Sequence, residues 1–143
     1  MIVPDANLLL YAYCAPSPWH PASRAWWESA LSGHEPVGLP WAVIQAFLRI
    51  GTNPRAFQPA FDAATGVEIV SGWLQRRRVL PLHPGERHWQ VLSDLIVTCQ
   101  IRGPLLADAH LAALAIENGA LLCSADRGFS RFPGLRWHNP LAA

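Results

Sequence analysis

Lysine is absent from this sequence, and all eleven of its basic residues are arginine. The absence excludes Schiff-base chemistry, a P-loop lysine and a lysine general base. An excess of one charge sign is also lacking, because ten acidic residues leave a formal net charge of +1. The composition therefore gives no strong electrostatic preference for nucleic acid or a membrane. The cysteines, Cys14, Cys99 and Cys123, are few, widely spaced and set among apolar residues. We expect buried thiols rather than disulfides or a zinc site.

Long hydrophobic runs are missing as well. No apolar stretch approaches the roughly 18 residues of a membrane-spanning helix, and no basic leader precedes the first apolar residues. We therefore expect a soluble, cytoplasmic protein. What is present is 51% apolar residues, including seven tryptophans and five phenylalanines, in a chain of 143 residues. This composition predicts one compact domain over residues 1–143 with a substantial core.

Short apolar segments alternate with helical patterns along the whole chain. Proline and glycine mark many of the boundaries between them, as Pro40 and Gly103 do. This alternation predicts an α/β domain built on a central, mostly parallel sheet. The expected strands lie at 2–3, 36–39, 79–82, 121–124 and 135–140, and the expected helices at 7–13, 21–33, 40–52, 61–78, 84–103 and 105–118.

Three aspartates occupy related places in this pattern. Asp5 follows the first strand, Asp126 follows a later strand, and Asp108 sits in the first turn of an apolar helix. Chain segments that leave the carboxyl ends of parallel strands converge at one edge of a sheet, where ligands bind. Each aspartate also has a purely structural explanation: a helix cap for Asp5, a favourable helix dipole for Asp108, and a turn for Asp126. The three together favour a functional site.

Carboxylates that lie close together repel one another and raise one another's pKa unless a cation intervenes. Hard oxygen ligands with few histidines or cysteines nearby suit Mg²⁺ or Mn²⁺. Asn7 and Ser124 lie two residues from Asp5 and Asp126. They could orient a carboxylate or a metal-bound water. An ordinary local turn is the competing explanation for Asn7.

Three segments resemble the PIN-domain family, and specifically VapC-type toxins of toxin–antitoxin pairs. They are "VPDANLLLYA", "LPWAVIQAFLRIGTNP" and "LADAHLAALAIENGALLCSADRGFSRFPGLRWHNP". The last is the most specific, because it joins an acid, a helix, a strand and a second acid at the family's spacing. The resemblance covers nearly the whole chain. It implies a PIN-like three-layer α/β/α sandwich and a Mg²⁺-dependent endoribonuclease, with Mn²⁺ as a possible replacement.

The resemblance also implies roles for individual residues. Asp5 and Asp108 correspond to the principal metal ligands, Asp126 completes the acidic cluster, and Asn7 and Ser124 support it. Cleavage of RNA at such a site is expected to leave a 5′-phosphate and a 3′-hydroxyl. The implied partners are a VapB-type antitoxin, the RNA substrate and a second copy of the chain in a homodimer.

One departure from the family concerns the helix after the second strand, where such toxins commonly carry a glutamate. The nearest candidate here is Gln45, an amide that offers no negative charge. A second reading follows from it: a PIN-like module with weak or lost catalysis that acts through antitoxin or RNA binding. Glu117 lies nine residues after Asp108, roughly 13 Å along a helix. It is a poor substitute for the missing acid, and we expect it at the surface.

Arginines near the acids are candidates for substrate binding. Arg127 and Arg131 flank the last acidic position in "DRGFSRF" and could contact a phosphate, or either could pair with Asp126. The run Arg76–Arg78 is expected to end a helix on a solvated face, with RNA backbone contact as the alternative. The histidines show no metal-ligand spacing, and His110 is expected to be structural or peripheral.

Overall fold

The computed structural model of the protein describes residues 1–142. Its centre is a five-stranded sheet in the order β3-β2-β1-β4-β5, and every pair of neighbouring strands is parallel. The expected α/β class with a parallel sheet is therefore confirmed. The strands are β1 (Ile2–Pro4), β2 (Val37–Pro40), β3 (Val79–Leu82), β4 (Leu121–Cys123) and β5 (Arg136–His138).

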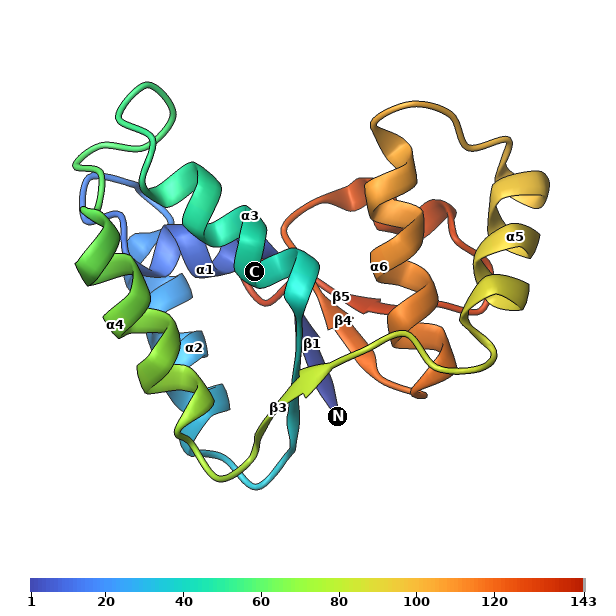
Figure 1. Ribbon diagram of the computed structural model, residues 1–143, viewed down its shortest axis with the longest axis horizontal. Coiled ribbons are helices and arrows are strands. Elements are labelled where there is room, and N and C mark those ends of the chain that lie inside the picture. The colour runs from blue at the N-terminus through green and yellow to red at the C-terminus, as the bar shows by residue number, and fades with distance from the viewer. Residues whose placement is uncertain (143) are drawn as a thin grey trace.

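Helices cover both faces of this sheet and make an α/β/α sandwich. In Figure 1, α1 to α4 gather to the left of β1, and α5 and α6 pack against each other to its right. The helices are α1 (Ala6–Ala12), α2 (His20–Ser32), α3 (Trp41–Gly51), α4 (Ala63–Leu74), α5 (His88–Cys99), α6 (Leu105–Glu117) and the short 3₁₀-helix η1 (Arg127–Arg131).

The inner strands are short but fully buried, which explains why they are apolar rather than alternating. Val3, Leu39 and Leu122 have no exposed surface. Strands of a parallel sheet covered on both faces are near-continuous hydrophobic runs. Because β1 lies between β2 and β4, the residues that follow β1 emerge in the middle of the sheet's carboxyl edge.

An aromatic cluster joins the helices on the left of the sheet. Phe47 of α3 and Trp73 of α4 have ring centroids 4.7 Å apart, and Trp27 of α2 meets Trp73 edge-on at 5.5 Å. The indole nitrogen of Trp73 donates a hydrogen bond to the hydroxyl of Tyr13, 3.0 Å away. Trp27, Phe47 and Trp73 are at most 2% exposed, so these large side chains form part of the core.

Two helix ends differ from the expectation. Asp62 caps α4 by accepting a hydrogen bond from the Thr65 amide, and the helix ends at Leu74. The run Arg76–Arg78 therefore follows the helix instead of ending it. Helix α5 stops at Cys99 because Gln100 adopts a left-handed conformation with φ of 53°, which breaks the helical hydrogen-bond pattern.

The cysteine expectation holds most clearly for Cys123. Its thiol is buried, and burial raises its pKa to about 12, so it stays protonated at neutral pH. Cys14 and Cys99 are partly buried, and all three thiols are free. Among residues 1–142, no helix combines the length and the apolar character that crossing a membrane requires.

Candidate active site

Asp5 and Ser124 leave adjacent strands at the carboxyl edge of the sheet. Residues Pro4 of β1 and Cys123 of β4 are paired in register, so the next residue on each strand is Asp5 or Ser124. The amide of Asp5 donates a hydrogen bond to the Cys123 carbonyl, 2.9 Å away. The strand register alone therefore brings chain positions 5 and 124 together.

Both carboxylate oxygens of Asp5 accept a hydrogen bond. Oδ1 accepts from the Ala6 amide at 2.8 Å, and Oδ2 accepts from the Ser124 hydroxyl at 2.7 Å. Asp5 thus caps α1, as its structural explanation predicted, and also points toward β4. These two bonds fix the carboxylate in one orientation.

Ser124 is fully buried and connects the other polar groups of this edge. Its hydroxyl oxygen accepts hydrogen bonds from the Asn7 side-chain amide at 3.3 Å and from the Asp126 backbone amide at 3.0 Å. The Ala125 amide in turn donates to Asn7 Oδ1 at 3.5 Å. The structure therefore brings Asn7 and Ser124 together with Asp5.

Asp108 and Asp5 both line a small cavity of about 100 Å³. It lies in the first turn of α6, whose N-terminal end approaches the carboxyl edge of the sheet. The other residues that line the cavity are apolar: Ala6, Ala42, Val43, Ala46, Ala107 and Leu111.

Asp126 begins η1, and its Oδ1 accepts a hydrogen bond from the Gly128 amide at 2.8 Å. A side chain at position 128 would have its Cβ 3.0 Å from Asp126 Oδ1 and 3.1 Å from an Arg131 nitrogen. A side chain at position 128 would therefore crowd both of these groups. The turn role expected for Asp126 is thus present, and its carboxylate also lies close enough to influence the other two acids.

The three carboxylates interact electrostatically. Burial is the main reason that the pKa of Asp5 is raised; the hydrogen bonds from Ser124 and Ala6 oppose this, and the charges of Asp108 and Asp126 add to it. The pKa of Asp108 is raised by burial and by the charge of Asp126, while the Arg131 guanidinium lowers it. Keeping these acids ionised at neutral pH is costly without a cation.

The donor set fits a hard divalent cation only in an open arrangement. Within residues 1–142, no three His, Cys, Asp or Glu side chains come close enough together to hold a metal ion. Mg²⁺, however, is often bound through one or two carboxylates plus waters and substrate phosphates. Asp5 and Asp108, two carboxylates that line one cavity, match that pattern.

The structure does not bring Gln45 to this cavity. Its side chain is exposed, and α3 instead presents Ala42, Val43 and Ala46 to the space between the acids. At 3.6 residues per turn, Gln45 lies about 100° around the helix from Ala46. The α3 wall of the cavity therefore carries no acid or amide.

Arg127 and Arg131 are exposed at the two ends of η1. The positive charge of Arg131 reaches Asp108, since it lowers the pKa of that carboxyl. Arg127 lines a different and larger cavity beside the acidic edge. Both arginines thus lie at the borders of the site.

A second polar cluster, which the sequence reasoning missed, lies at the other end of α6. Glu117 was expected at the surface, but its side chain is only 5% exposed; its Oε1 accepts a hydrogen bond from the Gly85 amide at 2.9 Å and lies 3.4 Å from His88 Nδ1. His88 Nε2 lies 3.0 Å from His110 Nδ1. Burial and the neighbouring His88 lower the pKa of His110, against a smaller opposite effect of Glu117.

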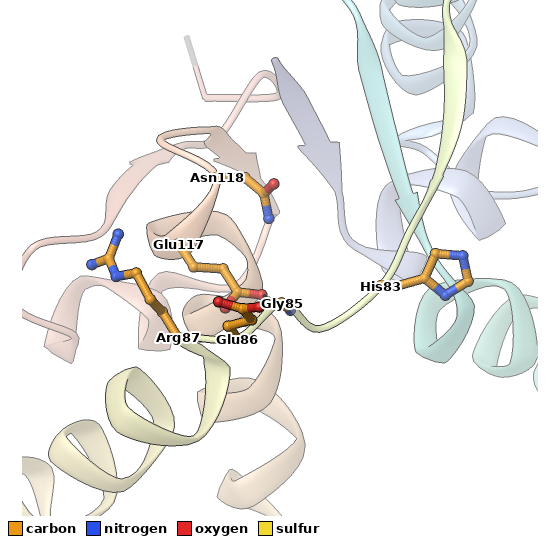
Figure 2. A pocket seen from close by; sticks show the side chains of 6 residues that line it. All are labelled: His83, Gly85, Glu86, Arg87, Glu117 and Asn118. Atoms are coloured by element: carbon orange, nitrogen blue, oxygen red, sulfur yellow. Dashed lines mark hydrogen bonds between the residues drawn. The ribbon is translucent and has the colours of Figure 1, made fainter.

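Figure 2 shows the cavity beside this cluster, with the Glu117 carboxylate next to Gly85 and Glu86, while His83 points away. The cluster joins the segment before α5 to the C-terminal end of α6. The structural role expected for His110 agrees with this arrangement. Its seven-residue spacing from Glu117, which places both on one face of α6, is the signal that could have revealed it.

Comparison with known proteins assigns the family. The PIN domain family model matches residues 2–135. Ribonuclease VapC43 of Mycobacterium tuberculosis is 40% identical over 99% of this chain and 96% of its own length, and ribonuclease VapC33 of the same species is 37% identical over 99% of both. The structure of VapBC-1 from nontypeable Haemophilus influenzae has a TM-score of 0.71 and 16% identity, with 99% of this chain and all of the other covered.

This chain therefore belongs to the PIN-domain family, and within it to the VapC-type proteins. The PIN-like α/β/α fold implied by the resemblance is confirmed by the structural match.

Proposed function

We propose that the protein is a metal-dependent endoribonuclease toxin of a toxin–antitoxin pair, which hydrolyses RNA phosphodiester bonds at the acidic edge of the sheet. The observation that carries the proposal is the cavity shared by Asp5 and Asp108, with Asp126 within electrostatic reach. The names of the relatives VapC43 and VapC33, both ribonucleases, support it.

The chain's own residues would act by position and charge. Asp5, oriented by Ala6 and Ser124, and Asp108, which lines the same cavity, would hold Mg²⁺ or Mn²⁺. A cation there supplies a more acidic bound water and neutralises charge on the phosphate under attack. Asp126 adds negative charge that favours the cation, and Asn7 and Ser124 keep the acids in place.

Phosphate binding falls to the arginines in this proposal. Arg127 and Arg131 lie at the ends of η1, and their guanidinium groups can hold the RNA backbone beside the acids. In-line attack of water on the phosphorus would form a new P–O bond and break the P–O3′ bond. O3′ then takes up a proton as the 3′-hydroxyl, and the phosphate stays on the 5′ oxygen of the other product.

The partners follow from the same assignment. VapBC-1 of H. influenzae is named for a VapB and VapC pair, which supports a VapB-type antitoxin as the partner of this chain. We also propose that the protein forms a homodimer and acts in the cytoplasm, where its RNA substrates occur. The alternative, a module with weak or lost catalysis, depended on the missing acid of α3. The names of the relatives VapC43 and VapC33, both ribonucleases, favour the catalytic reading over it.

An RNA cleavage assay tests the proposal. Wild type, Asp5→Asn and Asp108→Asn are compared in Mg²⁺, Mn²⁺ and EDTA, with Asp94→Asn, an exposed acid on α5, as the matched control. We expect metal-dependent cutting by wild type and the control, and none by the two site variants. If both site variants cut as fast as wild type, the acidic edge is not the catalytic site.

A further inference from the structure

A cavity of about 610 Å³ lies beside the acidic edge. Its walls come from segments far apart in the sequence: α1, the loop before α2, η1 and the chain after β5. Tyr11 of α1 and Leu141, which follows β5, both line it, together with Trp19, Arg127 and Asn139. Its size falls within the usual range of ligand pockets, roughly 300–1,000 Å³.

The cavity is continuous with the acidic edge through the backbone. Ala125, which lines it, stands between Ser124 and Asp126, and its amide donates to Asn7 Oδ1. Asn7 bonds Ser124, and Ser124 bonds Asp5. A ligand in this cavity would therefore sit beside whatever phosphate the acids act on.

The chemistry of the walls is aromatic and basic. Trp19 is 50% exposed, and among residues 1–142 it makes no ring–ring contact. Arg127 is the charged side chain that lines the cavity, and no carboxylate of the described residues lines it. Asn139 Oδ1 accepts a hydrogen bond from the Leu141 amide at 3.0 Å. Its amide nitrogen makes no hydrogen bond within the described part of the chain.

Trp19 is also held in place before any ligand arrives. Its backbone amide donates to the Ser17 hydroxyl at 3.2 Å, and the ring of the next residue, His20, bonds the Tyr11 carbonyl at 2.9 Å. The loop is thus fixed to α1, so that little order must be gained on binding.

We infer that this cavity receives one unstacked nucleobase of a single-stranded RNA substrate, next to the scissile phosphate. The base stacks on Trp19, the free Asn139 amide and the Tyr11 hydroxyl contact its edge, and Arg127 binds the adjoining phosphate. Stacking on aromatic side chains and hydrogen bonds to base edges are how proteins read single-stranded RNA. The inference rests on the proposed function and names the place where that site recognises sequence.

Replacing the RNA bases one at a time by abasic riboses measures how much cleavage depends on the base in the cavity. A single-stranded oligoribonucleotide of mixed sequence is cut by wild type in Mn²⁺, the cut is mapped, and each base within three positions of it is replaced in turn by an abasic ribose. We expect one position at which the loss of the base slows wild type about tenfold, as expected for one lost stacking contact.

Variants assign that position to the cavity. In Trp19→Ala, the abasic substitution at that position should not slow cleavage any further. Trp19→Phe keeps an aromatic ring, and Trp89→Ala removes a tryptophan of α5 that is 70% exposed, so both should show the wild-type dependence on the abasic position. An abasic profile of Trp19→Ala that matches wild type overturns the inference and leaves the nuclease proposal intact.

Photocrosslinking in EDTA tests the same contact without cleavage. A single-stranded oligoribonucleotide that carries 5-iodouridine is irradiated with the protein, and crosslinked peptides are identified by mass spectrometry. Crosslinks at Trp19 or Tyr11 support the inference even if no cutting is found. Crosslinks confined to other residues overturn the inference. Hydrogen exchange gives a second check: protection of the loop around Trp19 by bound antitoxin but not by RNA would also overturn it, because the cavity would then be a peptide site.

Discussion

The Ser124 hydroxyl donates a 2.7 Å hydrogen bond to Asp5 across 119 positions of sequence. The same oxygen accepts the Asp126 amide and the Asn7 side chain. A single buried hydroxyl thus determines the orientation of one acid directly and the path of the chain at another. Ser124 therefore joins the segment that carries Asp5 and Asn7 to the segment that carries Asp126.

Ser124→Ala should therefore destabilise the protein and perturb Asp5. The change leaves the Asp126 amide and one Asp5 oxygen without their partner, which costs about 1–3 kcal/mol of the free energy of unfolding. It also removes a bond that lowers the pKa of Asp5, so that pKa should rise further. Urea denaturation at neutral pH measures the first effect. The exposed Ser130→Ala is the control, and equal midpoints for wild type and Ser124→Ala would contradict the expectation.

The raised pKa of Asp108 predicts how stability depends on pH without metal. The folded protein binds this proton more tightly than the unfolded chain, so the contribution of Asp108 to the free energy of unfolding is greatest below the ordinary aspartate pKa, roughly 3.9. It falls as pH rises through the folded pKa and stays lower above it. Asp108→Asn removes that loss and should melt higher than wild type in EDTA at neutral pH, with the gain shrinking in acid.

Calorimetry across this pH range in EDTA tests the sign. The exposed Asp94→Asn should show no such gain. A lower melting temperature for Asp108→Asn at neutral pH would mean that the Asp108 carboxylate stabilises the metal-free fold. The destabilisation inferred from the burial of Asp108 and from its repulsion by Asp126 would then be absent.

An acid placed on the α3 wall should strengthen metal binding. Ala42 lines the cavity between Asp5 and Asp108 and lies in the first turn of α3, where a negative charge is favoured. Ala42→Glu should tighten Mn²⁺ binding about tenfold, or ~1.4 kcal/mol, in titration calorimetry. Gln45→Glu, three residues away but outside the cavity, should leave it unchanged. Equal effects of Ala42→Glu and Gln45→Glu on Mn²⁺ binding would contradict the structure, in which Ala42 lines the cavity and Gln45 does not.

The arginines predict the salt dependence of RNA binding. Each phosphate contact to a single strand contributes about 0.7 to the slope of log affinity against log salt concentration. Arg131→Gln and Arg127→Gln should each reduce that slope by about this amount, measured by fluorescence anisotropy in EDTA. Arg77→Gln tests the other candidate, the arginine run after α4. If Arg77→Gln alone reduced the salt slope, the RNA would contact the arginine run after α4 and not η1.

Much of the fold could be predicted from the sequence because local patterns carry it. The parallel sheet follows from short apolar strands between helices. Asp5 and Asp126 follow from their places after strands, and Asp108 from its place in the first turn of an apolar helix. Gln45 shows the limit of such reasoning. Its place in the sequence made it the nearest candidate for the missing acid, but its side chain is exposed outside the cavity, and that depends on which face of α3 packs.

The burial of Glu117 could not be predicted for a related reason. A glutamate at the C-terminal end of a helix normally contacts water. The seven-residue spacing from His110 places both residues on one face of α6, but it does not say what covers that face. What covers it is the segment before α5, which crosses the end of α6 and donates the Gly85 amide. That covering contact joins residues 32 positions apart and exists only in the folded chain.

Glu117→Ala should separate stability from catalysis. The change removes the acceptor of the Gly85 amide and the neighbour of His88, and it should cost about 1–3 kcal/mol of the free energy of unfolding. Glu117 lies nine residues along α6 from Asp108, roughly 13 Å, so RNA cleavage well below the melting temperature should match wild type. Glu86→Ala, an exposed acid of the same cavity, is the control and should change stability by less than about 0.5 kcal/mol. Loss of cleavage by a folded Glu117→Ala protein would instead show that the two ends of α6 act together in the reaction.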